Sequence, residues 1–152
     1  MVTDFVSPLT GTMLDLSQVP DQVFADRILG DGFACDLKGN VVTAPFDGEV
    51  ISLFPTGHAV ALKDEQGREV MIHIGIDTVK LKGNGFKPLV SVGQRVKRSD
   101  ALLELDLEAL SHAKSVISPV VFTSGQKIEL LKENEEIING EGDIIVIFQE
   151  GS

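Results

Sequence analysis

Short runs rich in valine and isoleucine, each closed by a turn with glycine, proline or aspartate, recur along this 152-residue chain. Such runs are typical of β-strands. With 15 Gly and 6 Pro, there is little room for long helices. We therefore predict an all-β fold, an antiparallel β-sandwich or barrel-sandwich hybrid with a few short helical turns. The clearest strand candidates are residues 41–43, 49–53, 58–63, 70–74 and 144–148.

Two segments have helical signals. Leu107 begins about two turns of helix after Asp106, whose side chain can cap the first free N–H groups. A second short turn is expected from Asp21 to Ile28, directly after Pro20.

Chain length limits the number of domains, and net charge limits the kinds of partner. A chain of 152 residues is predicted to form one domain over residues 1–152, with its core at about 5–148. The formal charge of −10 argues against nucleic acid or an anionic membrane as a partner, whereas a protein with a basic face would be attracted. We expect a monomer.

Apolar runs, the first residues and the cysteine content indicate where the protein resides and which chemistry it lacks. No apolar run has the roughly 20 residues needed to cross a membrane. The first residues lack the basic and apolar segments of a secretory signal, so we expect a cytoplasmic protein without direct membrane insertion. The single Cys35 can form neither an internal disulfide nor a thiolate metal cage.

Two of the three histidines lie in the arms of one predicted hairpin. If residues 64–67 form its turn, Lys63 faces Arg68 and His58 faces His73. A bulge of one residue would make the two histidines diagonal neighbours, still within reach. Each histidine could also be an ordinary packing residue.

Paired neutral imidazoles can divide the work of group transfer. One ring attacks an electrophile such as phosphorus, while the other donates an N–H to the transferred group. The hydroxyl of Thr56 could fix the tautomer of His58, and the carbonyl of Gly75 could accept from His73. Gly57 and Gly75 leave room for a large group to approach.

Two other classes of function are compatible with a hairpin that carries paired histidines. A zinc peptidase of the lysostaphin type shares duplicated hairpins with histidines on adjacent strands, but needs a His-x-x-x-Asp pair and a His-x-His pair, which this sequence lacks. We therefore predict no metal site. An inert binding module would show no covalent change when a phosphoryl donor is supplied.

The sequence resembles one family over about residues 5–148: the glucose-type enzyme IIA proteins of the bacterial phosphoenolpyruvate-dependent sugar phosphotransferase system. The block His73-Ile-Gly-Ile-Asp-Thr-Val79 is its most specific part. The other matching segments follow in family order and are VPDQVFA (19–25), GDG (30–32), APFDG (44–48), FPTGHA (54–59), GNGF (83–86), GQRV (93–96), LDL (105–107) and SPVV (118–121).

The resemblance implies a phosphoryl relay in sugar uptake. His73 would be phosphorylated on Nε2 by the phosphocarrier protein HPr, with His58 in support, and would pass the group to a cysteine of the permease IIB domain. Thr56 would orient His58, and the Gly75 backbone would orient His73. Further residues are implied to contact partners: Asp21, Val23, Phe24, Ile28, Leu29, Phe54, Met71, Asp77 and Val79.

The resemblance also bears on cofactors and further partners. It implies no resident cofactor, only covalent phosphate on histidine. A zinc ion shared by His58, His73 and a partner's carboxylate occurs in some relatives and is not inferred for this chain. Regulated enzymes or transporters are further candidate partners. The sequence leaves open the sugar, the cognate permease, and whether the domain stands alone or belongs to a longer chain.

Overall fold

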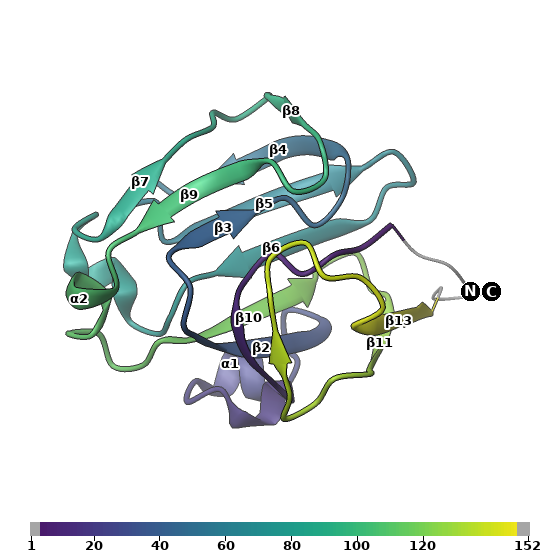
Figure 1. The fold of residues 1–152 in the computed structure, drawn as a ribbon, viewed down its shortest axis with the longest axis horizontal. Coiled ribbons are helices and arrows are strands. Elements are labelled where there is room, and N and C mark those ends of the chain that lie inside the picture. Colours follow the sequence, from purple (N-terminus) through teal and green to yellow (C-terminus); the bar gives the residue numbers. More distant parts are fainter. Residues whose placement is uncertain (1–3, 149–152) are drawn as a thin grey trace.

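Short antiparallel strands are the main secondary structure of the computed structural model, which describes residues 4–148 (Figure 1). All strand pairings within these residues are antiparallel, which confirms the predicted all-β class. In chain order the strands are β1 (Gly11–Leu14), β2 (Asp31–Leu37), β3 (Val41–Thr43), β4 (Gly48–Leu53), β5 (Ala59–Asp64), β6 (Glu69–His73), β7 (Phe86–Pro88), β8 (Arg95–Val96), β9 (Ala101–Leu105), β10 (Ile117–Phe122), β11 (Lys127–Leu130), β12 (Glu136–Ile137) and β13 (Ile145–Phe148).

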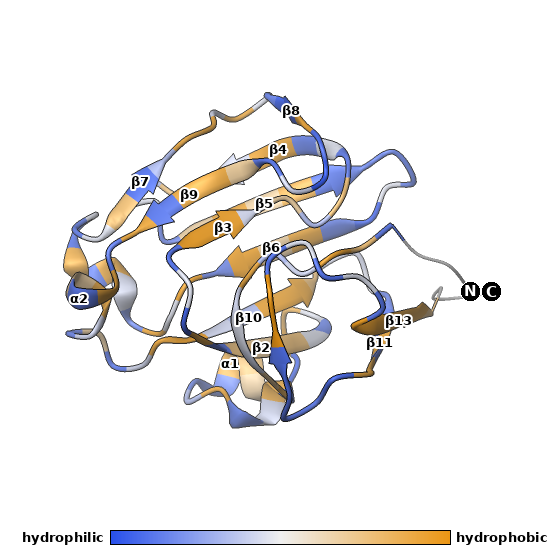
Figure 2. Cartoon of the chain, viewed as in Figure 1, coloured by the Kyte–Doolittle hydropathy of each residue, from blue (hydrophilic) through white to orange (hydrophobic). Residues whose placement is uncertain are grey.

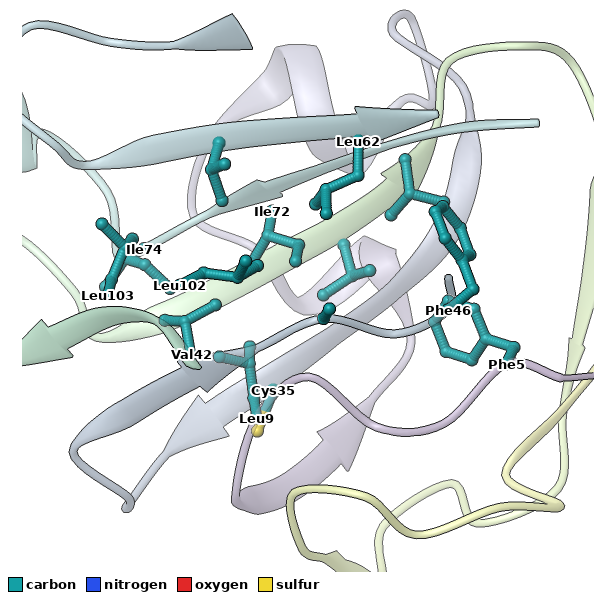
Figure 3. Packing of buried hydrophobic residues seen from close by; sticks show 14 of the residues in the cluster. Phe5, Leu9, Cys35, Val42, Phe46, Leu62, Ile72, Ile74, Leu102 and Leu103 are labelled. Atoms are coloured by element: carbon teal, nitrogen blue, oxygen red, sulfur yellow. The ribbon is translucent and has the colours of Figure 1, made fainter. Parts of the chain in front are cut away.

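The strands form three sheets. The largest has the order β12-β1-β2-β10-β6-β5-β4-β8, and two smaller sheets have the orders β3-β9-β7 and β11-β13. Side chains of β3 and β9 meet those of β5 and β6 in one apolar core, so these sheets form the two layers of a sandwich (Figure 3). Hydrophobic residues follow the strands and polar residues gather in the turns (Figure 2).

A second, smaller apolar cluster lies on the outer face of β2 and β10. Alternate residues of these strands point to opposite faces: Phe33 joins the main core, whereas Ala34 and Val121 pack with Leu16 and Phe24. The segment containing the first helix therefore covers the outside of the large sheet. It lies against the same face as Met71, two residues before His73.

The helical turns occur where predicted but are shorter. Helix α1 (Gln22–Ala25) begins after Asp21, whose side chain accepts from the N–H of Val23 at 2.9 Å. It does not reach Ile28, because Arg27 has a left-handed backbone with φ of 58°. Helix α2 (Leu107–Leu110) is a single turn capped by Asp106 as predicted, and the 3₁₀ turns are η1 (Leu16–Gln18) and η2 (Thr78–Leu81).

The β5–β6 hairpin differs from the prediction by one residue. Ala59, not His58, is paired with His73, and Lys63 is paired with Glu69. The predicted direct opposition of the two histidines is therefore wrong, and the two residues are offset by one position, as expected for one extra residue in the turn.

The physical reason lies in the turn. Its loop contains three residues, 65–67, because the N–H of Asp64 donates to the carbonyl of Arg68 at 3.0 Å. Gly67 takes the left-handed conformation that such loops need, with φ of 85°. The Asp64 carboxylate accepts from the N–H groups of Gln66 and Arg68, both at 2.9 Å. These bonds fix the longer loop.

Among residues 4–148, no helix is long and apolar enough to cross a membrane.

Candidate functional site

The rings of His58 and His73 meet at one end of the hairpin. Their centroids are 5.1 Å apart, and the ring planes are inclined by 75°. His58 precedes β5, and its carbonyl accepts from the N–H of Ile74 at 2.8 Å. Regular alternation from this pairing would send the two imidazoles to opposite faces. A bend at His58, directly after Gly57 with φ of 78°, breaks the alternation and allows the rings to meet.

His73 is held by its Nδ1 atom. This nitrogen lies 2.8 Å from the carbonyl oxygen of Gly75, which can only accept a hydrogen bond. In the neutral ring, Nδ1 therefore carries the hydrogen and Nε2 carries the free lone pair. His73 is half-buried, so part of the residue can be reached from outside.

The loop after His73 is fixed by hydroxyl groups. Ser118, which is buried, accepts from the N–H of Gly75 at 2.9 Å, and Thr78 donates to the carbonyl of Ile74 at 2.6 Å. Ser118 and Thr78 were not assigned a role from the sequence, although both lie in segments that resemble the family. Their function depends on contacts between distant segments, which no local pattern reveals.

His58 is held from several sides. Its Nδ1 forms a short hydrogen bond with the hydroxyl of Thr56, as predicted for this pair. The rings of Phe54 and Phe86 lie at centroid distances of 5.0 and 6.5 Å from it, both edge to face. His58 is only 5 % exposed, so little of the residue can be reached by a bulky group.

Both imidazoles are held neutral near pH 7. Burial lowers the pKa of His58, and the nearby His73 ring lowers it further. Burial also lowers the pKa of His73, although the bond to Gly75 and the charge of Asp21 partly oppose this effect. A neutral His73 keeps the lone pair that a nucleophile needs.

Most of the apolar residues predicted to contact partners lie at the surface. Five of the seven predicted contact residues are exposed: Val23, Ile28, Leu29, Phe54 and Val79. The other two are less accessible. Phe24 is buried with its ring 5.1 Å from that of His73, and Met71 is half-buried in the smaller cluster. We refer to the five exposed residues as the apolar rim.

The two predicted acidic residues differ in their surroundings. Asp21 caps α1 and acts electrostatically on His73. Asp77 has a left-handed backbone with φ of 61°, and its carboxylate lies 3.7 Å from the ammonium group of Lys80. Of the two carboxylates, Asp21 is the one whose charge raises the pKa of His73.

The third histidine does not join the site. His112 follows α2 and is exposed. Within the described residues, no three side chains of His, Cys, Asp or Glu gather closely enough to hold a metal ion. Two imidazoles alone make an incomplete zinc site.

Fold and site together define a class of protein: an antiparallel β-sandwich that presents a nucleophilic imidazole, backed by a second imidazole, on an apolar face. Residues 3–128 match the family described as phosphoenolpyruvate-dependent sugar phosphotransferase system, EIIA 1. The chain belongs to this family and is a phosphoryl-relay component of sugar uptake.

Known relatives support the assignment. The chain is 47 % identical over 128 residues to the glucose-specific EIIA components of Bacillus cereus and Bacillus anthracis, covering 84 % of this chain and 78 % of each relative. The structure is similar to that of glucose permease IIA from Mycoplasma capricolum. The TM-score is 0.84 and the identity 37 %, with 95 % of this chain and 94 % of that one covered. Nothing in these comparisons supports the peptidase alternative.

Proposed function

We propose that His73 takes a phosphoryl group from the phosphohistidine of HPr and passes it to a cysteine of a permease IIB domain. One observation carries the proposal. Nδ1 of His73 is occupied by the Gly75 carbonyl at 2.8 Å, which leaves Nε2 as the attacking atom. Because relatives are named glucose-specific, we infer that the permease is of the glucose type. Membership of the family supports a relay that acts in the cytoplasm.

The two transfer steps balance without a further reactant. The lone pair of His73 Nε2 attacks phosphorus as the N–P bond of the donor breaks, and the donor ring leaves with that electron pair. In the second step a cysteine thiolate of the IIB domain attacks the same phosphorus. A S–P bond forms, the N–P bond breaks, and His73 returns to its neutral form.

His58 stabilises the transferred group in this proposal. When the Thr56 hydroxyl donates to Nδ1 of His58, the Nε2 of that ring carries a hydrogen and can donate to a phosphoryl oxygen. Such a donor contributes most when it is held in place before negative charge develops. The edge-to-face contact with Phe54 supports this fixed orientation.

Docking is assigned to the apolar rim and to the charges beside it. Exposed apolar side chains exclude water when a partner covers them. The net charge of −10 steers a partner with a basic face. Asp21 and Asp77 repel phosphate on His73 and so keep its transfer potential high, whereas an arginine of the partner can bridge phosphate and carboxylates during exchange. Phe24 acts from beneath, as packing for His73.

The test separates loading from unloading. The protein is incubated with phosphoenolpyruvate, enzyme I and HPr, and intact mass then reports one acid-labile phosphoryl group. We expect His73→Ala to remain unmodified and His58→Gln to load but to unload slowly to a IIB domain. His112→Gln is the matched control, because His112 is exposed and outside the site, and it should behave as wild type. Acid-labile phosphate on the His73→Ala protein would overturn the assignment.

A further inference from the structure

The chain contains two Asn-Gly pairs, Asn84-Gly85 and Asn139-Gly140, in contrasting surroundings. Asparagine before glycine is the sequence most open to deamidation, since glycine has no side chain to hinder attack by its own amide nitrogen. A folded protein suppresses this reaction where it binds the two groups that must react. The two pairs can therefore be compared directly within one molecule.

Asn139 is protected by its contacts. Its side-chain amide nitrogen donates to the carbonyls of Pro8 at 2.8 Å and Val41 at 3.2 Å, and to the hydroxyl of Thr43 at 3.0 Å. The amide oxygen accepts from Thr10 at 2.6 Å. The attacking nitrogen, that of Gly140, donates to the carbonyl of Ser7 at 2.9 Å. Deamidation here requires all these bonds to open.

Asn84 lacks such protection. Its side chain is exposed and makes no hydrogen bond with any residue from 4 to 148, and the Gly85 N–H donates to none of them either. The turn is closed by a bond from the N–H of Phe86 to the carbonyl of Gly83 at 3.2 Å. Its main chain is also held by bonds from the N–H of Asn84 to the carbonyl of Leu81 at 3.0 Å and from the N–H of Asp106 to the carbonyl of Gly85 at 2.9 Å, but neither bond involves the two groups that react. The fold nevertheless favours glycine at 85, where φ is 100° and an added Cβ would lie 3.1 Å from the Cβ of Ala109.

We propose that Asn84 is a site of spontaneous deamidation that converts part of the protein to aspartate and isoaspartate at this turn. The Gly85 nitrogen attacks Cγ of Asn84, a new N–C bond forms, and the bond from Cγ to the side-chain nitrogen breaks. Ammonia leaves with the proton of the Gly85 amide. Water then opens the five-membered ring at either carbonyl, giving aspartate or isoaspartate.

The position gives the reaction a consequence for the relay. A Cβ on Gly83 would lie 3.7 Å from the carbonyl oxygen of Thr56, and Phe86 contacts the ring of His58. Isoaspartate adds one methylene to the main chain between these two contacts, whereas aspartate adds only charge. We infer that the isoaspartate form transfers phosphate more slowly. This effect rests on the proposed function, while the modification itself does not.

The experiment has two separate readouts. The protein is aged in mildly alkaline buffer, and digested peptides are analysed by mass spectrometry and by isoaspartyl methyltransferase labelling. We expect Asn84 to convert at least about tenfold faster than Asn139, because the bonds around Asn139 must first open. Equal conversion at the two sites, or no conversion at Asn84 while a peptide of residues 82–86 converts, would overturn the proposed site.

Phosphoryl acceptance from HPr is followed in parallel. Aged wild type should lose rate in proportion to its isoaspartate content, and methyltransferase repair should restore the rate. Asn84→Gln should resist ageing, since its longer side chain disfavours the five-membered ring, and Asn84→Asp should stay near the wild-type rate. If Asn84→Gln lost rate as fast as wild type, the link to transfer would be wrong even where the peptide map confirmed the modification.

Discussion

Replacing Gly75 by alanine should damage both stability and phosphoryl transfer. Gly75 has φ of 68°, and an added Cβ would lie 2.6 Å from the carbonyl oxygen of Ser115 and 2.8 Å from Cγ2 of Thr78. The left-handed conformation costs an alanine about 1–2 kcal/mol. Overpacking adds about 1–3 kcal/mol, because the first atom met is backbone and cannot turn aside. We therefore expect the free energy of unfolding to fall by about 2–5 kcal/mol.

Gly67→Ala is the matched control. Gly67 lies in the turn of the same hairpin with φ of 85°, but an added Cβ would meet nothing within 4 Å. Only the conformational cost of about 1–2 kcal/mol remains. Urea unfolding measures both variants, and acceptance of phosphate from HPr is measured well below the unfolding midpoint.

The two variants should differ in transfer as well. The carbonyl that holds Nδ1 of His73 belongs to Gly75, so a small shift of this loop misplaces the nucleophile, and an error of about 1 Å can cost about 100-fold in rate. The Gly67→Ala rate should remain close to wild type. Equal loss of stability in the two variants, or a Gly75→Ala protein that accepts phosphate normally, would refute this reasoning.

Three further predictions concern the same hairpin. Burial lowers the pKa of His58 and His73 in the folded state. Near and below the ordinary histidine pKa of 6.5, the unfolded state therefore binds more protons than the folded state, so the free energy of unfolding should fall as pH decreases. The urea midpoint should follow this trend, less steeply in His58→Gln, and a midpoint that rises on acidification would contradict it. Thr56→Val removes the hydrogen-bond partner of His58 Nδ1 and should slow phosphoryl transfer about tenfold in single-turnover kinetics. Thr56→Ser keeps the hydroxyl and should stay near the wild-type rate, so equal rates in the two variants would exclude a role for the hydroxyl in transfer. Asp64→Asn should lower the free energy of unfolding in urea by about 3–5 kcal/mol, because it leaves Arg68 charged and buried without its partner. A loss below about 1 kcal/mol would mean that Asp64 and Arg68 do not form a stabilising ion pair in solution.

Local patterns in the sequence were sufficient for much of the fold. The strand runs and turn residues predict β3, β4, β5, β6 and β13 within about one residue of their observed bounds. Asp106 marks a helix start because a cap involves neighbours in sequence. The helix lengths were overestimated, since the left-handed Arg27 ends α1 without glycine or proline as a signal.

The register of the hairpin could not be settled from one sequence. Loops of two and of three residues both fit a turn that ends in glycine, and the choice decides whether His58 or Ala59 is paired with His73. The structure selects the longer loop through the bonds made by Asp64. The burial of single residues could not be predicted from the local sequence either. Phe24 directly follows the exposed Val23, yet its ring is buried against that of His73.

The central claim is that phosphorus bonds to one nitrogen of one ring, and it can be observed directly. Protein with ¹⁵N-labelled histidine is loaded from phospho-HPr and studied by ¹⁵N and ³¹P NMR, with His58→Gln used to assign the rings. We predict one N–P coupling, at Nε2 of His73, while Nδ1 of that ring keeps its hydrogen bonded to the Gly75 carbonyl. Coupling at Nδ1, or at either nitrogen of His58, would contradict the account.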